Sequence, residues 1–114
     1  MMIPTPALWR CMAVVEVCDQ VKDLDDLIRE EGLSYRWEVA ANSPKGFLWY
    51  ELHVDSGGSE HRAARTAWAI LWSLKRLSEE GGLPDFRIVS GGEWLNIPPS
   101  ELQQPDEGAR LSST

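Results

Sequence analysis

Hydrophobic and polar residues follow two different periods along this chain, and the periods change in a defined order. Apolar residues recur at every second position over residues 8–17, 35–41, 47–55 and 86–90, which is typical of strands with one buried face. They recur with the period of an amphipathic helix over residues 19–31 and 59–80. The predicted order is therefore strand, helix, strand, strand, helix, strand.

This β-α-β-β-α-β order predicts an α+β fold of the ferredoxin-like class, a two-layer sandwich with an antiparallel sheet and two helices on one face. It indicates a single domain over residues 1–97, followed by a polar, Pro-containing tail over residues 98–114. A chain of 114 residues with 43% hydrophobic residues and six Trp can bury a core without a metal or disulfides.

The alternation also predicts which face of the sheet each side chain occupies. In the first strand we expect the odd positions to face the helices and the even positions, Met12 and Val14 among them, to face outward. The expected inward residues are Trp9, Cys11, Ala13, Val15 and Val17. In the third strand Leu48, Tyr50, Leu52 and Val54 are expected inside, with Trp49, Glu51, His53 and Asp55 outside.

Local signals predict the connections between these elements. Asp19 or Asp23 is expected to cap the first helix, whose buried stripe is Val21, Leu24, Leu27 and Ile28. Residues 43–46, Ser-Pro-Lys-Gly, fit a type I turn, so the second and third strands should form a hairpin. Residues 81–82, Gly-Gly, should end the second helix.

The net charge of the chain indicates which classes of partner it can bind. The net charge is −7 and the sequence pI is about 4.7, so the general field repels a phosphate backbone and makes direct nucleic-acid binding unfavourable. The same charge favours a protein partner with a basic surface. Neither a signal-peptide pattern nor an apolar run long enough to span a membrane is apparent, so no membrane association is expected.

The two cysteines indicate the cellular compartment of the protein. Cys11 and Cys18 lie seven residues apart along one strand, about 23 Å at about 3.3 Å per residue, which is too far for a disulfide. Two free thiols fit a reducing compartment, and the sequence therefore predicts a cytoplasmic protein.

Three surfaces are candidates for binding a partner. The first is on the second helix, where Trp68 and Trp72 sit one turn apart between Arg65 and Lys75. The alternative for these rings is burial under the tail or under Trp94 and Leu95. The second and third surfaces are the open sheet face, with Met12, Val14 and Trp49, and the acidic first helix, with Asp23, Asp26 and Glu30.

Candidate chemical sites are weaker. Residues 55–62 could hold an anion at a helix start, but they lack the Lys and the spacing of a phosphate-binding loop. A metal set of His53, Asp55 and His61 has no established ligand spacing. Glu51 and His53 share a sheet face and could form an acid–base pair only inside a cleft. We therefore predict no metal, cofactor or catalytic residue.

These observations favour a non-enzymatic protein–protein interaction module. One concrete form is an inhibitor or regulator of a nucleic-acid-handling complex, by analogy with the small acidic inhibitors that phages encode. The alternative is a small-ligand-binding or enzymatic domain that uses the open sheet face, with Glu51, His53 and Trp49 in a pocket that a second copy of the chain could enclose.

Overall fold

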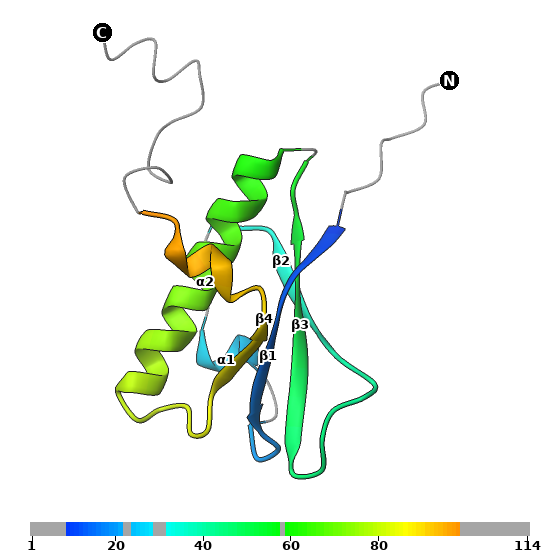
Figure 1. Ribbon diagram of the computed structural model, residues 1–114, viewed down its shortest axis with the longest axis vertical. Coiled ribbons are helices and arrows are strands. Elements are labelled where there is room, and N and C mark those ends of the chain that lie inside the picture. Colours follow the sequence, from blue (N-terminus) through cyan, green and yellow to red (C-terminus); the bar gives the residue numbers. More distant parts are fainter. Residues whose placement is uncertain (1–8, 22–23, 29–31, 58, 99–114) are drawn as a thin grey trace, which may run out of the picture.

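The protein is an α+β structure in which a four-stranded antiparallel sheet is covered on one face by helices (Figure 1). The computed structural model describes residues 9–21, 24–28, 32–57 and 59–98. The elements in chain order are β1 (Trp9–Cys18), α1 (Leu24–Leu27), β2 (Tyr35–Val39), β3 (Phe47–Asp55), α2 (Glu60–Glu79), β4 (Arg87–Ser90) and the 3₁₀ helix η1 (Gly92–Asn96).

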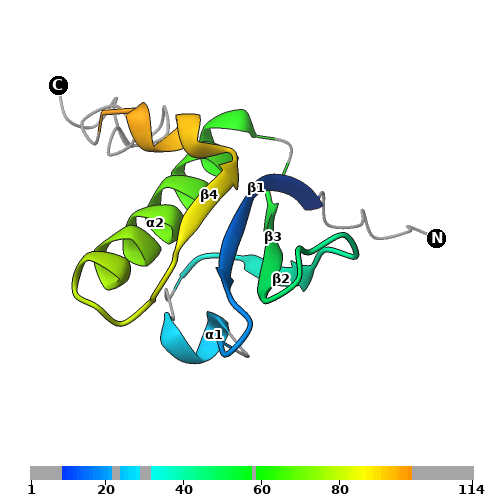
Figure 2. The same ribbon diagram turned by 60° about the horizontal axis from the view of Figure 1, so that its bottom comes forward.

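The strand order in the sheet is β2-β3-β1-β4, so β1 and β3 are the central strands. Each neighbouring pair is antiparallel; Val15 lies opposite Tyr50 on β3 and opposite Ile88 on β4. Figure 2 shows α2 running diagonally across one face of the sheet, with α1 beside its lower end. The other face of β1, β3 and β2 carries no helix of the described chain.

The core lies between the sheet and α2. The inward side chains of the central strands are buried, with Val15, Val17, Leu52 and Val54 at 0% exposure, which confirms the predicted alternation in β3 and in the second half of β1. From α2 the buried residues are Ala63, Ala64, Thr66, Ala67, Ile70, Leu71 and Leu74. Leu24 of α1 and Leu83 also belong to the buried cluster.

The first half of β1 differs from the prediction because the strand contains a β-bulge. Cys11 pairs with His53 and Ala13 pairs with Leu52, so Met12 is an extra residue on β1. The extra residue reverses the phase of the alternation. Trp9 and Cys11, predicted to be inside, are therefore exposed on the open face, and Met12, predicted to be outside, is buried at 6% exposure.

Contacts from the end of the chain hold this bulge. The indole Nε1 of Trp94 in η1 donates a hydrogen bond to the Met12 carbonyl oxygen at 3.0 Å. Gly91 precedes η1 with a φ of 87°, and a Cβ at this position would lie 2.3 Å from the Met12 oxygen and 2.6 Å from the Cβ of Ala13. Only glycine therefore lets the β4–η1 connection lie against the bulge.

The second helix forms as predicted. Ser59 caps α2 by accepting a hydrogen bond from the backbone N–H of Arg62 at 3.1 Å, and Gly81, with a φ of 87°, follows its end. No helix within the described residues has the length and apolar character needed to cross a membrane.

The first helix and the hairpin turn depart from the prediction. Within the described residues α1 has four residues, and the Asp19 amide donates to Gly46 O of the β2–β3 link at 3.1 Å instead of beginning a helix. Aspartate has a low helix propensity, which disfavours a longer helix in this segment. Because the segment places only Leu24 and Ile28 in the core, Leu27 is 40% exposed. The turn is shifted by one residue: Phe47 N donates to Pro44 O, and Gly46 has a φ of 86°.

Candidate functional site

The aromatic pair on α2 lies where the sequence predicts, on the side of the helix away from the sheet core. Trp68 and Trp72 are in contact, with ring centroids 5.8 Å apart and planes tilted by 41°. The ammonium of Lys75 sits 4.5 Å from the centroid of the Trp72 ring. Trp72 is 37% exposed, Trp68 is half-buried and Arg65 is exposed. We call Arg65, Trp68, Trp72 and Lys75 the α2 stripe.

The predicted cover of this helix is present in part. The 3₁₀ helix η1 packs on α2, and Trp94 and Leu95 lie against the core. Trp72 nevertheless keeps more than a third of its surface exposed. The tail over residues 99–114 lies outside the described residues, as do Asp23 and Glu30 of the predicted acidic surface. Asp26 is described and exposed on α1.

The predicted apolar patch on the open sheet face is only partly present: Val14 and Trp49 are half-buried residues of that face, and Met12 is missing from it. Met12 is in the core because of the bulge, which removes one of its three members. Trp49 is on the open face as predicted, but its indole Nε1 donates a 2.8 Å hydrogen bond to Glu16 Oε2. Arg87 of β4 donates to the same carboxylate from Nη2 at 3.1 Å. The hydrogen bonds from Arg87 and then Trp49 hold the pKa of Glu16 below its usual range.

The bulge instead creates a cluster of potential ligands on the open face. Cys11 of β1 lies opposite His53 of β3, and Glu51 is two residues before His53 on the same face of β3. The thiol sulfur, an imidazole nitrogen and a carboxylate oxygen of these three residues all lie within 4.8 Å of one another. Nε2 of His53 is 3.0 Å from Oε1 of Glu51. We call these three residues the open-face cluster.

Charged and aromatic side chains border the open-face cluster. Glu38 of β2 places Oε2 3.9 Å from Nε2 of His53 and accepts an ion-pair contact from Arg36 at 2.8 Å. The Arg36 guanidinium lies over the Trp9 ring, 4.7 Å from its centroid. The His53 side chain is 17% exposed. Burial, and then the negative charge of Glu51, raise the pKa of the Cys11 thiol.

Sequence reasoning found two members of this cluster and missed the third. Glu51 and His53 were expected on the open face, but strict alternation put Cys11 in the core. The set of His53, Asp55 and His61, which the sequence analysis considered and did not adopt as a metal site, is not the group that the described residues bring together. His61 is exposed on α2, and Asp55 accepts the amide of Gly57 at 3.0 Å.

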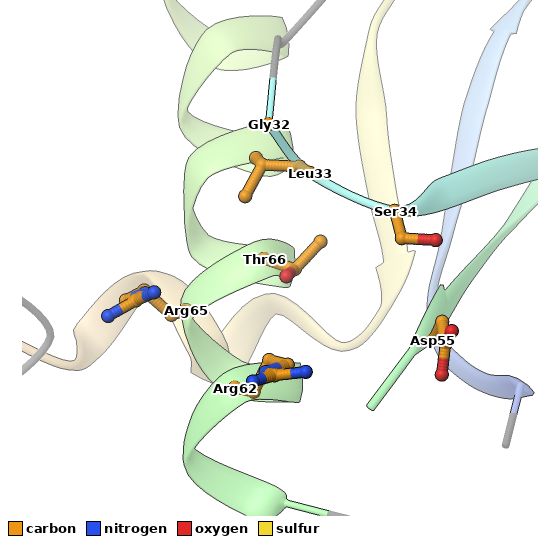
Figure 3. A pocket seen from close by; sticks show the side chains of 7 residues that line it. All are labelled: Gly32, Leu33, Ser34, Asp55, Arg62, Arg65 and Thr66. Atoms are coloured by element: carbon orange, nitrogen blue, oxygen red, sulfur yellow. The ribbon is translucent and has the colours of Figure 1, made fainter. Parts of the chain in front are cut away.

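A pocket of about 240 Å³ lies between the start of β2, the end of β3 and the first turns of α2 (Figure 3). Its lining residues are Gly32, Leu33, Ser34, Asp55, Arg62, Arg65 and Thr66. Figure 3 shows Arg62 extending toward the side of Asp55, whereas Arg65 extends the other way. Two arginines and the Asp55 carboxylate share the lining, so its charges are mixed, and the anion site considered for residues 55–62 stays a prediction.

Comparisons of the chain with protein-family models, with curated proteins and with solved structures find no significant match. The functional assignment therefore depends on the α2 stripe and the open-face cluster alone.

Proposed function

We propose that the protein is a non-enzymatic interaction module that docks on another protein through the α2 stripe. The observation that carries this proposal is the 37% exposure of Trp72, whose ring contacts Trp68 at a tilt of 41° and has the Lys75 ammonium 4.5 Å from its centroid. A large ring held in place on a 20-residue helix is already ordered before a partner arrives. Little side-chain entropy is then lost on binding, which is one reason Trp dominates interface hot spots.

The exposed part of Trp72 is large enough to matter for affinity. At 37% exposure the ring offers about 90 Å² of a total near 250 Å². Burying that area at about 25 cal/mol per Å² contributes about 2 kcal/mol, or roughly a 30-fold change in dissociation constant. This magnitude sets the size of the effect that an experiment must detect.

The net charge of −7 supports a partner with a basic surface, because it would accelerate association at low salt. Asp26 on α1 is exposed, which supports a role in such a contact. A regulator or inhibitor of a nucleic-acid-handling complex is the concrete form that we propose. Cytoplasmic location is part of the same proposal, supported by the free thiols of Cys11 and Cys18.

The test is a quantitative capture of host proteins with three forms of the chain. The wild type, Trp72→Ala and Val39→Ala are immobilised at equal density. Val39 is a matched control because it is an exposed apolar residue, at 55%, on a different element, β2. We expect at least one protein whose recovery falls by tenfold or more with Trp72→Ala and is unchanged with Val39→Ala.

Two results would count against this proposal. In the first, no captured protein distinguishes Trp72→Ala from the wild type although the variant keeps the circular dichroism of the wild type. In the second, Val39→Ala and Trp72→Ala lose the same proteins to the same extent. Charge is tested separately: Asp26→Lys should slow association with the captured partner, and the slowing should vanish at high salt.

A second candidate function has one observation in its favour. Glu51 and His53 approach to 3.0 Å on the open face, which supports a small-ligand-binding or enzymatic domain with that face enclosed by a second copy. Light scattering tests this alternative first, since a monomer at working concentration leaves the face without an enclosing wall. His53→Ala should then abolish ligand turnover while leaving docking through the α2 stripe intact.

The ferredoxin-like assignment is also kept as a proposal. The element order and the central β3-β1 pair support it. The four-residue α1 and the additional η1 are departures from a regular pattern of two long helices.

A further inference from the structure

The open-face cluster combines three kinds of metal-ligating atom on two adjacent strands. Cys11 and His53 are register partners on β1 and β3, and Glu51 precedes His53 by two positions along the same face. Neighbouring positions of this kind bring side chains together without any loop, because opposed Cβ atoms lie about 4.5–5.5 Å apart. The backbone that carries them is fixed by Leu52 and Val54, which are fully buried.

We propose that Cys11, Glu51 and His53 form a site for a single Zn²⁺ ion, with a fourth position open to water. Thiolate, imidazole and carboxylate are the three ligand types that zinc takes in proteins. Ca²⁺ and Mg²⁺ take oxygen ligands almost exclusively, so the sulfur and nitrogen donors of this set favour zinc.

The present distances are close to those that zinc requires. Bond lengths of about 2.3 Å to sulfur and about 2.0–2.2 Å to nitrogen and oxygen place tetrahedral ligand atoms about 3.4–3.6 Å apart. The three ligand atoms lie within 4.8 Å of one another, and Nε2 of His53 is 3.0 Å from Oε1 of Glu51. Side-chain adjustments of about 1 Å therefore suffice, and the ion would enter where the His53–Glu51 contact now lies.

Charge is balanced at this position. The Cys11 thiolate and the Glu51 carboxylate together neutralise a divalent ion, and the thiol proton passes to solvent when the metal binds. Arg36 is the nearby cation, but it is paired with Glu38 at 2.8 Å and stacked on Trp9. Glu38 keeps a carboxylate oxygen 3.9 Å from Nε2 of His53, but because Glu38 is paired with Arg36, the pair adds no net charge beside the ion.

The test uses Co²⁺ as the probe, because cobalt occupies zinc sites and a cobalt–thiolate bond gives a charge-transfer absorption that other ligands do not. The metal-free full chain is titrated with Co²⁺ under reducing conditions. We expect one cobalt per chain, a thiolate band that saturates, and loss of that band when Zn²⁺ is added.

Matched variants assign the band to the cluster. Cys18→Ser and His61→Ala are the controls, because Cys18 lies on the same strand and His61 is an exposed imidazole on α2. Both should leave the titration unchanged. Cys11→Ser should abolish the band, and His53→Ala and Glu51→Gln should weaken cobalt binding by more than about tenfold, the lower end of what loss of a supporting residue costs.

Other outcomes overturn the site. Absence of a thiolate band in the folded wild type excludes it. A band that disappears in Cys18→Ser, or one that is insensitive to His53→Ala, assigns the metal elsewhere. A stoichiometry of one cobalt per two chains would mean that Cys11 residues of two copies share the ion. The α2 stripe is not involved in this test, so its result is independent of the docking proposal.

Discussion

Replacing Gly91 by alanine is the sharpest perturbation of the bulge. Gly91 has a φ of 87°, and the added Cβ would lie 2.3 Å from the Met12 carbonyl oxygen and 2.7 Å from the Ala13 Cα. These neighbours are backbone atoms of a central strand, so they cannot rotate away. The β4–η1 connection must move outward, which also pulls Trp94 from its hydrogen bond to Met12 O.

The cost of this change can be separated into two parts. A left-handed φ costs a residue with a Cβ about 1–2 kcal/mol, whatever surrounds it. The close contacts add about 1–3 kcal/mol for overpacking, and loss of the Trp94 hydrogen bond adds about 1 kcal/mol. Gly81→Ala isolates the first part, because Gly81 has the same φ of 87° and no atom of the described part of the chain lies within 4 Å of the added Cβ.

Urea unfolding of both variants measures the difference. We expect Gly91→Ala to be less stable than Gly81→Ala by about 2–4 kcal/mol. With a urea m-value of about 1–3 kcal/mol per M, its midpoint should lie at least about 0.7 M lower. Equal midpoints for the two variants would refute the close approach of Gly91 to the bulge.

Three further predictions concern the same sheet. Met12→Ala should lower the free energy of unfolding by about 2–5 kcal/mol in a urea titration, as a buried methionine requires, whereas an outward Met12 would cost under about 0.5 kcal/mol. Trp37→Phe should lower the free energy of unfolding less than Trp94→Phe, because the buried Nε1 of Trp37 has no hydrogen-bond partner among the described residues while that of Trp94 donates to Met12 O; equal losses would contradict this. The lowered pKa of Glu16 contributes stability at neutral pH that is lost as the pH falls through the folded-state pKa; Arg87→Gln should raise that pKa in an NMR titration, and an unchanged pKa would exclude the ion pair as a cause.

The parts of the fold that local sequence determines were predictable. In β3 polar and apolar residues alternate without interruption, and the structure follows that alternation from Tyr50 to Val54. In α2 a capping serine, a long apolar stripe and a terminal glycine agree with one another, and the helix begins and ends within a residue of the prediction. Agreement between independent local signals is what made these two elements reliable.

β1 was predicted with the wrong phase in its first half because its own sequence does not decide it. Met12, Ala13, Val14 and Val15 are all apolar, so either alternation buries hydrophobic side chains. The choice is made by Gly91 and by Trp94, which is 82 positions from Met12 in the chain. A contact between residues so far apart in the chain cannot be predicted from the local pattern of hydrophobic and polar residues.

The same long-range contact explains why the sequence predicted the α2 stripe in full but only part of the open-face cluster. Trp68 and Trp72 are one turn apart on a regular helix, so spacing alone brings their rings together. Cys11 joins Glu51 and His53 only if the bulge shifts the register of β1. The length of α1 was overestimated for a different reason, since its apolar period was weighed above the low helix propensity of its aspartates.

The zinc proposal and the position of Cys11 on the open face both depend on one structural claim, that the bulge at Met12 reverses the inward–outward alternation of β1. Thiol labelling tests this claim most directly. A maleimide is added in native buffer to two variants. The first is Cys18→Ser, whose remaining thiol is Cys11. The second carries Met12→Cys together with Cys11→Ser and Cys18→Ser, so that its single thiol is at position 12. We predict that Cys11 is labelled in the folded protein and that the thiol at position 12 reacts only when urea unfolds the chain. Rapid native labelling at position 12 together with protection of Cys11 would contradict the bulge.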